Sequence, residues 1–206
     1  MNQMHERLIF WTLNGEKQAP ISCSEGDTEE LFRGLLFSRN LISSPVDCME
    51  FEEENETIHI RLKGINTAGD GEIPAIVDNP FRIEYAKIRQ LDQIMSGKRE
   101  FGNHQAAVVY NDQSIERQDI GRHNAIDKVV AAAIMNEFNP AHSVLCMSGR
   151  VSLEILNKAA HAGFPVIFTL KFPSDLAAEA AQKYGMMIVS YFKGQVEYSG
   201  KNRWAD

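Results

Sequence analysis

Four residues that could bind an anion, Gly121, Arg122, His123 and Asn124, stand together at the start of a predicted helix. Apolar residues follow at the spacing of one helix face, namely Ile126, Val129, Val130, Ala133 and Ile134. The first turn of a helix has unpaired N–H groups and a positive dipole end, and phosphate groups bind there. Gly121 would let the backbone turn tightly, and Asn124 would cap the helix. Taken alone, the run is either a phosphate site or an ordinary capped helix start with solvated charges.

A second run of the same kind, Ser148-Gly149-Arg150, follows the apolar strand that is predicted at residues 143–147. A helix is predicted at residues 151–163, so both runs join a strand, a glycine, an arginine and a helix start. Two such corners at one sheet edge could hold two phosphates of one nucleotide through backbone N–H groups and bidentate guanidinium contacts. For each corner alone, a well-formed turn with a solvated arginine explains the residues equally well.

Other side chains in the same region carry groups that could take part in catalysis. His123 could act as a general acid or base, with Asp127 four residues on to orient its ring, but no nucleophile stands beside it. His104, ahead of a predicted strand, could reach into the same crevice or lie in a surface loop. Cys146 lies near the end of a predicted buried strand, where a thiol is usually an inert apolar group. We therefore assign no catalytic residue, and Cys146 is only the thiol nearest to the predicted crevice.

The composition excludes several classes of protein. The 206 residues are 44% hydrophobic and 24% charged, which is typical of globular chains, and the formal net charge is −7. The acidic balance argues against a general binder of nucleic acid or of membrane surfaces. The chain has no apolar run of transmembrane length and no signal-peptide pattern, so we expect a cytoplasmic protein. The three cysteines and six histidines lack disulfide or zinc-ligand spacing, so we expect no metal site and no zinc deaminase.

The elements that must position these side chains fall into two groups. Residues 1–75 are predicted to form a small α+β domain. Its first hairpin has strands at residues 7–15 and 17–23 that turn at Asn14-Gly15, and a second hairpin covers residues 49–64. Between the hairpins, a helix is predicted to start at Asp27 or Thr28. Residues 64–80 are rich in Gly, Asp, Asn and Pro and are predicted to form a long loop.

Residues 76–206 are predicted to form a separate α/β domain. After a helix at residues 83–97, strands and helices alternate with short connections, which indicates three layers around a partly parallel sheet. Ligands of open α/β sheets bind outside the carboxyl ends of the strands. We therefore expect both Gly-Arg corners at that sheet edge, together with the hairpin turn at Lys193-Gly194.

Several long segments resemble the family of the formate dehydrogenase accessory protein FdhD. In chain order they are GDTEELFRGLLFSRNLI, GNHQAAVVY, DIGRHNAIDKVV, SGRVSLEILNKAAHAGFPVI and PSDLAAEAAQKYGMMIVSYFKGQ. The resemblance covers nearly the whole chain in the right order. It implies a cytidine-deaminase-like three-layer α/β domain preceded by a small α+β domain, usually assembled as a homodimer.

The resemblance also implies an activity, partners and a site. It implies a cytoplasmic sulfurtransferase that receives persulfide sulfur from a cysteine desulfurase. The sulfur is passed to Mo-bis(molybdopterin guanine dinucleotide), the cofactor destined for formate dehydrogenase or a related molybdoenzyme. By position, the implied cofactor-binding residues are Gly121, Arg122, His123, Asn124, Ser148, Gly149, Arg150, Tyr191, Phe192, Lys193, Gly194, Gln195 and Val196, to which we add His104 from the Gly-x-His segment.

One part of the chain departs from the family pattern. The family carries a Cys-x-x-Cys loop ahead of the helix that precedes Gly-x-His, and sulfur transfer needs a thiolate that can hold a persulfide. Here residues 64–80 contain no cysteine, and Phe101 replaces the first glycine of the usual Gly-Gly-x-His. We therefore expect cofactor binding without efficient sulfur transfer. The alternative is a non-catalytic carrier of a guanine nucleotide or of the molybdenum cofactor.

Overall fold

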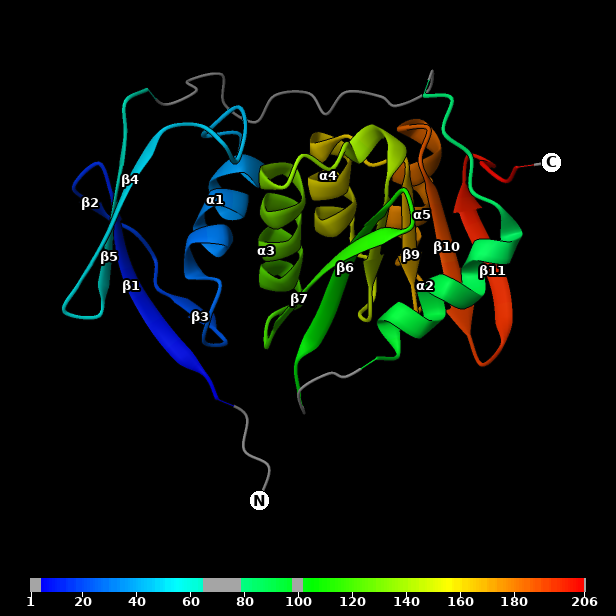
Figure 1. Cartoon of the computed structure of the whole chain (residues 1–206), viewed down its shortest axis with the longest axis horizontal. Coiled ribbons are helices and arrows are strands. Elements are labelled where there is room, and N and C mark those ends of the chain that lie inside the picture. The colour runs from blue at the N-terminus through cyan, green and yellow to red at the C-terminus, as the bar shows by residue number, and fades with distance from the viewer. Residues whose placement is uncertain (1–4, 65–78, 98–101, 206) are drawn as a thin grey trace.

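The computed structural model describes residues 5–64, 79–97 and 102–205, and it shows two β-sheets with helices between and beside them (Figure 1). Residues 5–64 form the N-terminal unit, in which one helix packs on a small sheet. The sheet has the order β2-β1-β5-β4, and β3 also pairs with β1. The elements are β1 (Arg7–Leu13), β2 (Glu16–Lys17), β3 (Ile21–Cys23), α1 (Thr28–Ser38), β4 (Met49–Glu54) and β5 (Thr57–Leu62).

The predicted turn at Asn14-Gly15 forms, but the strand after it is interrupted. The two residues have φ angles of 50° and 87°, as the common two-residue hairpin turn requires. The chain then forms β2 and, after a break at residues 18–20, β3. Pro20 has no N–H for a strand ladder, and the carbonyl of Ala19 accepts a hydrogen bond from Trp11 Nε1 at 2.8 Å. The prediction of one continuous strand at residues 17–23 is therefore wrong.

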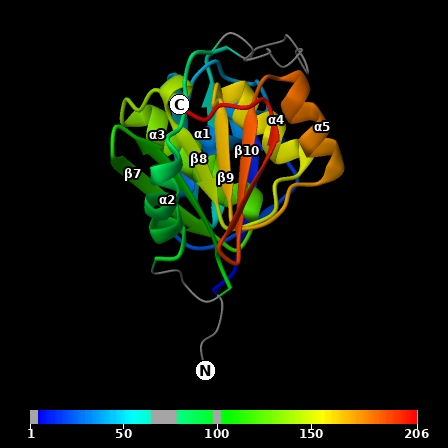
Figure 2. The ribbon, with the colours of Figure 1, turned by 90° about the vertical axis from the view of Figure 1, so that its right-hand side faces the viewer.

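Residues 79–205 form the C-terminal unit around a six-stranded sheet with the order β11-β10-β9-β8-β6-β7. Strands β8, β9 and β10 are parallel, and the other three are antiparallel to their neighbours. Helices α3, α4 and α5 cover one face, and α2 covers the other (Figures 1 and 2). The elements are η1 (Tyr85–Lys87), α2 (Ile88–Met95), β6 (His104–Tyr110), β7 (Gln113–Asp119), α3 (Arg122–Met135), η2 (Pro140–His142), β8 (Val144–Met147), α4 (Leu153–Ala162), β9 (Val166–Thr169), α5 (Asp175–Lys183), β10 (Met187–Phe192) and β11 (Gln195–Gly200).

This arrangement confirms the predicted three-layer, partly parallel α/β fold. The helix predicted at residues 83–97 is shorter than expected, because Ile83 forms a parallel bridge with Trp204 instead. Its N–H donates to the carbonyl of Arg203, and its own carbonyl accepts from Ala205, each at 2.9 Å. The C-terminal tail thus uses the backbone groups that would have started the helix. Among the helices that the structure describes, none has the length and apolar character of a membrane span.

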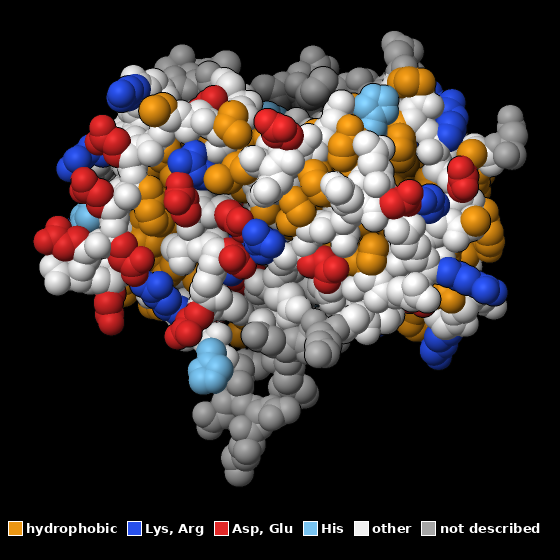
Figure 3. Space-filling view, viewed as in Figure 1, with side chains coloured by type: hydrophobic (Ala, Val, Ile, Leu, Met, Phe, Trp, Pro, Cys, Tyr) orange, Lys and Arg blue, Asp and Glu red, His pale blue; other side chains and the backbone are white. Residues whose placement is uncertain are grey.

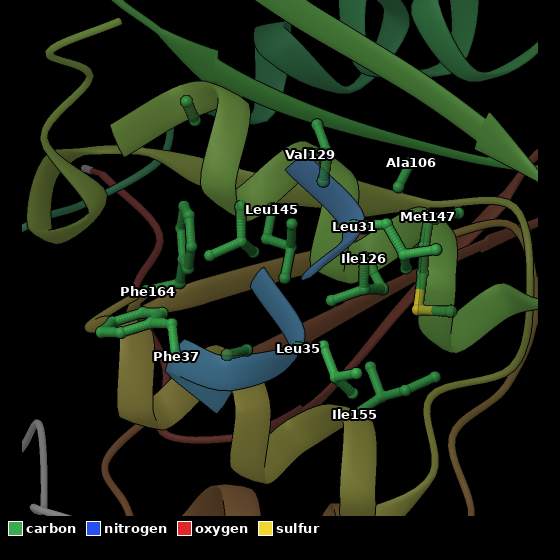
Figure 4. Close-up of a cluster of buried hydrophobic side chains, with 14 of the residues drawn as sticks. Leu31, Leu35, Phe37, Ala106, Ile126, Val129, Leu145, Met147, Ile155 and Phe164 are labelled. Carbon is green, nitrogen blue, oxygen red and sulfur yellow. The ribbon is translucent and has the colours of Figure 1, made fainter. Parts of the chain in front are cut away.

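A single apolar core joins the two units. Helix α1 crosses α3 so closely that a Cβ atom on Gly34 would lie 2.0 Å from the backbone oxygen of Asp127. Around this crossing, buried side chains meet from α1, α3, α4, the six-stranded sheet and the loop between α4 and β9 (Figure 4): Leu31, Leu35, Phe37, Ala106, Ile126, Val129, Leu145, Met147, Ile155 and Phe164. A second apolar cluster lies between α2 and the opposite face of the sheet. The predicted boundary at residue 75 falls outside the described residues, so the division into two domains stays a prediction.

Candidate functional site

The two Gly-Arg corners lie at the same edge of the six-stranded sheet. Strands β8 and β9 end at this edge, while the antiparallel β6 begins there and β7 ends there. A Cβ atom on Gly149 would lie 3.6 Å from Arg122 Cβ and 3.3 Å from His104 Nδ1. The predicted meeting of the two Gly-Arg corners at the sheet edge is therefore observed, and of the two alternatives for His104 the structure shows the one beside the corners.

The corners form the sides of a cleft of about 390 Å³, lined by Gly102, Asn103, His104, Arg122, Ser148, Gly149, Arg150 and Lys171. Three of these side chains are cationic and none is a carboxylate, although the chain has a net charge of −7. Within the described residues, none of the three cations forms an ion pair. Elsewhere charges of both signs are interspersed, as on the face shown in Figure 3. A concave site with unbalanced positive charge attracts anions.

Three lining residues of the cleft, Gly102, Asn103 and Lys171, were not predicted as site residues from the sequence. Lys171 stands two residues after the last residue of β9, the position that Gly149 holds after β8. The rule that places ligands at the carboxyl ends of parallel strands could therefore have indicated Lys171. Asn103 immediately precedes β6, and no pattern in the sequence distinguishes it from other polar loop residues.

The Gly121-Arg122 corner is built differently from the prediction. Helix α3 begins at Arg122, and Gly121 before it has φ −94° and ψ 120°, a conformation that any residue can adopt. Space rather than backbone conformation favours glycine here, because a Cβ atom would lie 3.0 Å from Asn124 Nδ2, closer than an ordinary van der Waals contact. Asn124 lies inside the first turn, where Nδ2 donates to Ser22 O at 2.8 Å and to Asp119 Oδ1 at 2.9 Å. The predictions of a tight glycine turn and of Asn124 as the N-cap are therefore wrong.

The acceptor at this corner is Asp119, the last residue of β7. Its Oδ1 accepts from the N–H of Gly121 at 2.8 Å, and its Oδ2 accepts from the N–H of Ser24 at 3.1 Å. Lys128 Nζ lies 2.9 Å from the same Oδ2, and the side chains of Asp119 and Lys128 are both 0% exposed. A buried ion pair thus stands directly behind the corner that carries Arg122.

The Gly149-Arg150 corner is held mainly by backbone groups and two buried hydroxyls. Ser148 N donates to Gln105 O at 2.9 Å, and Ser148 Oγ accepts from Gln105 N at 3.0 Å. Thr169 Oγ1 donates to Gly149 O at 2.7 Å and accepts from Lys171 N at 3.1 Å. The arginine that follows is exposed. The next helix begins later than predicted, at Leu153 rather than at residue 151.

His123 does not have the catalytic environment that Asp127 was predicted to provide. Asp127 lies 2.6 Å from Lys158 Nζ and accepts from Ser38 Oγ at 3.0 Å, so its carboxylate is held by other groups. His123 Nε2 is 3.3 Å from a carboxylate oxygen of Glu154 but, in the described part of the chain, has no hydrogen-bond partner. Burial lowers the pKa of His123, assisted by nearby cations and opposed by Glu154. His123 does not line the described cleft, and its predicted binding role stays a prediction.

The thiols are poorly placed to carry sulfur. Cys146 is fully buried between the sheet and α2, and burial raises its pKa, as predicted for a packed strand. Burial and the nearby Asp119 raise the pKa of Cys23 to about 11. Cys48 is exposed in the N-terminal unit and is not one of the lining residues of the cleft. In the described ranges, no three His, Cys, Asp or Glu side chains gather closely enough to hold a metal ion.

The hairpin at residues 191–196 turns at Lys193-Gly194, whose φ angles are 51° and 82°. Among the lining residues described for the cleft, none comes from this hairpin. The ring of Phe192 nevertheless approaches it, because Lys171 Nζ lies 5.5 Å and Lys193 Nζ 5.4 Å from the ring centre. Tyr191 and Val196 pack against the apolar cluster on the α2 side of the sheet. Cofactor binding by this hairpin therefore stays a prediction.

The segment with no cysteine is only partly described. Gly64, Asn79 and Pro80 are described, whereas residues 65–78 and Phe101 lie outside the described residues. The absence of cysteine between residues 64 and 80 is therefore a fact of the sequence alone.

Comparisons with known proteins agree with the resemblance seen in the sequence. Among curated proteins, the sulfur carrier protein FdhD of Nocardia farcinica is 43% identical over 90 residues, 42% of this chain and 32% of that protein. The sulfur carrier protein FdhD of Saccharolobus solfataricus is 27% identical over 205 residues, 87% of this chain and 80% of that protein. The match thus spans about a third of the Nocardia relative but most of the Saccharolobus one.

A solved structure shares the fold. It is a protein from Desulfotalea psychrophila that is described as a formate dehydrogenase accessory protein, and it superposes with a TM-score of 0.81 at 22% identity. The match covers 97% of this chain and 89% of that one. The model of the FdhD/NarQ family matches residues 77–204, which is more than half of the chain. The chain therefore belongs to the FdhD/NarQ family.

Proposed function

We propose that this member of the FdhD/NarQ family binds Mo-bis(molybdopterin guanine dinucleotide) as a client and assists the maturation of a formate dehydrogenase or related molybdoenzyme. The observation that carries the proposal is the cleft in which Arg122, Arg150 and Lys171 gather without a carboxylate. A guanine dinucleotide offers phosphate groups that such a cleft can bind. The choice of this client rests on the family resemblance of the sequence.

The cleft suits phosphate groups for two physical reasons. Arg122 is the first residue of α3, so a phosphate near its guanidinium also lies near the positive end of a 14-residue helix. Arg150 and Lys171 approach from two neighbouring strand ends, so they can meet a second phosphate of the same ligand. Guanidinium groups make bidentate hydrogen bonds to phosphate, which a lysine cannot do.

We propose that sulfur transfer by this chain is weak or absent. A persulfide carrier needs an accessible thiol that is partly ionised at neutral pH. Cys23 and Cys146 are buried with raised pKa values, and residues 64–80 contain no cysteine. Cys48 is exposed but has no cleft residue beside it. The alternative function is a carrier of a guanine nucleotide or of the molybdenum cofactor, without any chemistry.

Calorimetric titration with GDP and ADP tests the proposed binding. We expect GDP to bind more tightly than ADP, because the resemblance implies a guanine ligand, and binding should weaken with added salt. For arginine variants of the cleft, Arg89→Ala is the matched control, because Arg89 is an exposed arginine on α2 and does not line the cleft. Equal affinities for both nucleotides would contradict the guanine proposal, and no binding of either would contradict the phosphate site.

Incubation with a cysteine desulfurase and cysteine tests the sulfur proposal. The mass of each cysteine-containing peptide is measured afterwards. We expect no stoichiometric mass gain of one sulfur atom at any of the three thiols. A gain at Cys146 that disappears in the Cys146→Ala variant would restore a sulfurtransferase function. Such a result would also support a cysteine desulfurase as a partner.

We propose a homodimer in the cytoplasm, on the strength of the resemblance. Sedimentation equilibrium of the full chain measures its mass directly. A mass near that of one 23.2 kDa chain would contradict the dimer.

A further inference from the structure

The ion pair behind the cleft is completely buried. Lys128 Nζ and Asp119 Oδ2 are 2.9 Å apart, and neither side chain is exposed to solvent. Two charges removed from water lose hydration, which their attraction offsets only with good geometry and further hydrogen bonds. Apolar residues of similar size often give equal or greater stability in such a place. Stability alone therefore does not account for the Asp119–Lys128 pair. The other hydrogen bonds of Asp119 lead to the corner that carries Arg122.

The carboxylate of Asp119 connects three separate segments. Oδ1 accepts from Gly121 N at 2.8 Å and from Asn124 Nδ2 at 2.9 Å, and both donors flank Arg122 in the sequence. Oδ2 accepts from Ser24 N at 3.1 Å in addition to the ion pair with Lys128. Lys128 and Ser24 thus hold Oδ2 and fix the orientation of the carboxylate. Oδ1 in turn holds the backbone of the corner that carries Arg122.

Ser24 extends this network from the N-terminal unit into the cleft. Its hydroxyl accepts from Ile120 N at 2.9 Å and donates to Asn103 Oδ1 at 3.0 Å. Asn103 lines the cleft, and Ile120 immediately precedes the Gly121-Arg122 corner. Ser24 follows β3 directly and is itself buried. One serine of the N-terminal unit therefore contacts two segments that shape the cleft.

A second buried pair on the same helix offers a contrast. Asp127 lies 2.6 Å from Lys158 on α4, and its side chain is only 2% exposed. Asp127 also accepts a hydrogen bond from Ser38 Oγ of α1, at 3.0 Å. This pair joins helices to one another, whereas the Asp119–Lys128 pair reaches the backbone of the cleft. Both pairs are buried, but only the Asp119–Lys128 pair contacts the cleft backbone, so the Asp127–Lys158 pair serves as a control.

We propose that Asp119 is a positioning residue, which sets the place of Arg122 in the cleft by holding Gly121 N and Asn124. Lys128 and Ser24 fix the carboxylate, so the N-terminal unit takes part in the binding site although none of its described residues lines the cleft. This inference rests on the proposed binding of a phosphate ligand.

Two double variants separate charge from hydrogen bonding. Asp119→Leu/Lys128→Met removes both charges and the carboxylate that accepts from Gly121 N and Asn124 Nδ2. Asp119→Asn/Lys128→Met also removes both charges but retains an oxygen that can accept from Gly121 N. The matched control, Asp127→Leu/Lys158→Met, removes the second buried pair. Affinity for GDP and for inorganic pyrophosphate is measured by calorimetry for each folded protein.

We expect the Leu/Met variant to bind both ligands at least about tenfold more weakly, the loss that follows when one charge-assisted hydrogen bond is no longer oriented. The Asn/Met variant should stay within about threefold of the natural chain, because the Gly121 contact survives. The control at Asp127 should change stability without a comparable change in affinity. Equal affinities of the Leu/Met variant and the natural chain would overturn the proposal.

Amide hydrogen exchange at the corner gives a readout that needs no ligand. Gly121 N–H and Ile120 N–H are bonded to Asp119 and Ser24, so both should be protected in the natural chain. In the Leu/Met variant we expect Gly121 to exchange at least about tenfold faster, while Val129 in the interior of α3 is unchanged. Protection of Gly121 as in the natural chain would overturn the positioning role. If neither ligand binds the natural chain, the proposed function fails, and the exchange result still decides how the corner is held.

A third variant covers the case in which the double variants do not fold. Ser24→Ala removes one hydroxyl and should speed exchange at Ile120 and weaken pyrophosphate binding. Ser22→Ala is its matched control, since Ser22 is an exposed residue of the adjoining strand β3. Identical behaviour of the two serine variants would overturn the participation of the N-terminal unit.

Discussion

The Gly121-Arg122 and Gly149-Arg150 corners have the same two residue types and bring their arginines to one cleft, but different forces hold them. The first corner depends on a buried carboxylate whose partners, Ser24 and Lys128, come from other segments. The second depends on backbone pairing with the neighbouring strand β6 and on the hydroxyl of Thr169. Arg122 is half-buried, whereas Arg150 is exposed.

This difference shows that one sequence motif can have two physical origins. A corner held by backbone groups of neighbouring strands forms whenever the sheet forms. A corner held by a buried ion pair depends on side chains that meet only after the two units have packed together. We therefore expect the first corner to be more sensitive to single substitutions than the second.

The largest expected effect is on stability, when each corner loses its main side-chain acceptor or donor. Asp119→Ala leaves the ammonium group of Lys128 buried and unpaired, so the free energy of unfolding should fall by about 3–5 kcal/mol. Thr169→Val removes only a hydroxyl that bridges two backbone groups, which should cost about 1–3 kcal/mol. Urea unfolding of both variants measures the two losses. An equal or larger loss for Thr169→Val would contradict the comparison.

The next effect concerns binding at the two arginines. Arg122→Ala and Arg150→Ala should each weaken GDP binding by about 1.5–3 kcal/mol if the guanidinium meets a phosphate. Arg122 should lie at the upper end, because its half-buried position strengthens electrostatic attraction. Calorimetric titration measures both changes against the Arg89→Ala control. Unchanged GDP affinity in either variant would show that the arginine concerned does not bind a phosphate and is only a solvated turn residue.

The two glycines provide a smaller test of packing. A Cβ atom at Gly121 would meet Asn124 Nδ2 at 3.0 Å, and that amide is held by two hydrogen bonds. At Gly149 the nearest atoms are His104 Nδ1 at 3.3 Å and Met147 Cε at 3.4 Å. Overpacking costs about 1–3 kcal/mol, and we expect Gly121→Ala to cost more than Gly149→Ala. Thermal unfolding of both variants decides the order, and the reverse order would show that the Asn124 amide moves easily.

The smallest expected effect is a dependence of stability on pH at the first corner. Burial lowers the pKa of His123, so the unfolded chain binds more protons than the folded one as pH falls through the ordinary histidine value of about 6.5. The free energy of unfolding should therefore fall from pH 7 toward pH 5, by a modest amount because the ring is partly exposed. His161, whose pKa burial also lowers, adds a dependence of the same sign. The His123→Gln variant should show a shallower decrease, and an identical pH profile would contradict the assignment to His123.

Much of the fold could be predicted because it depends on local periodicity. The apolar spacing of residues 126–134 predicts α3, and Asn14-Gly15 predicts the first turn, since helix faces and hairpin turns are determined by neighbours in the chain. The residues at which helices and strands begin and end were less predictable. The helix after Ile83 is shortened by a bridge to Trp204, a residue more than a hundred positions away, and no local pattern records that contact.

The sequence by itself determined the types of the cleft residues and their places at strand ends. It placed Gly121, Arg122, Gly149 and Arg150 after strands, and the rule for ligands of α/β sheets then brought them to one edge. Only the tertiary structure decided which groups hold those residues and in which direction. Asn124 points to Ser22 and Asp119, and Asp127 points to Lys158, because hydrogen-bonding groups bind whatever partner folding brings within reach. A partner such as Ser24, about a hundred residues from Asp119, leaves no periodic signal in the sequence, so packing of the two units alone makes that contact.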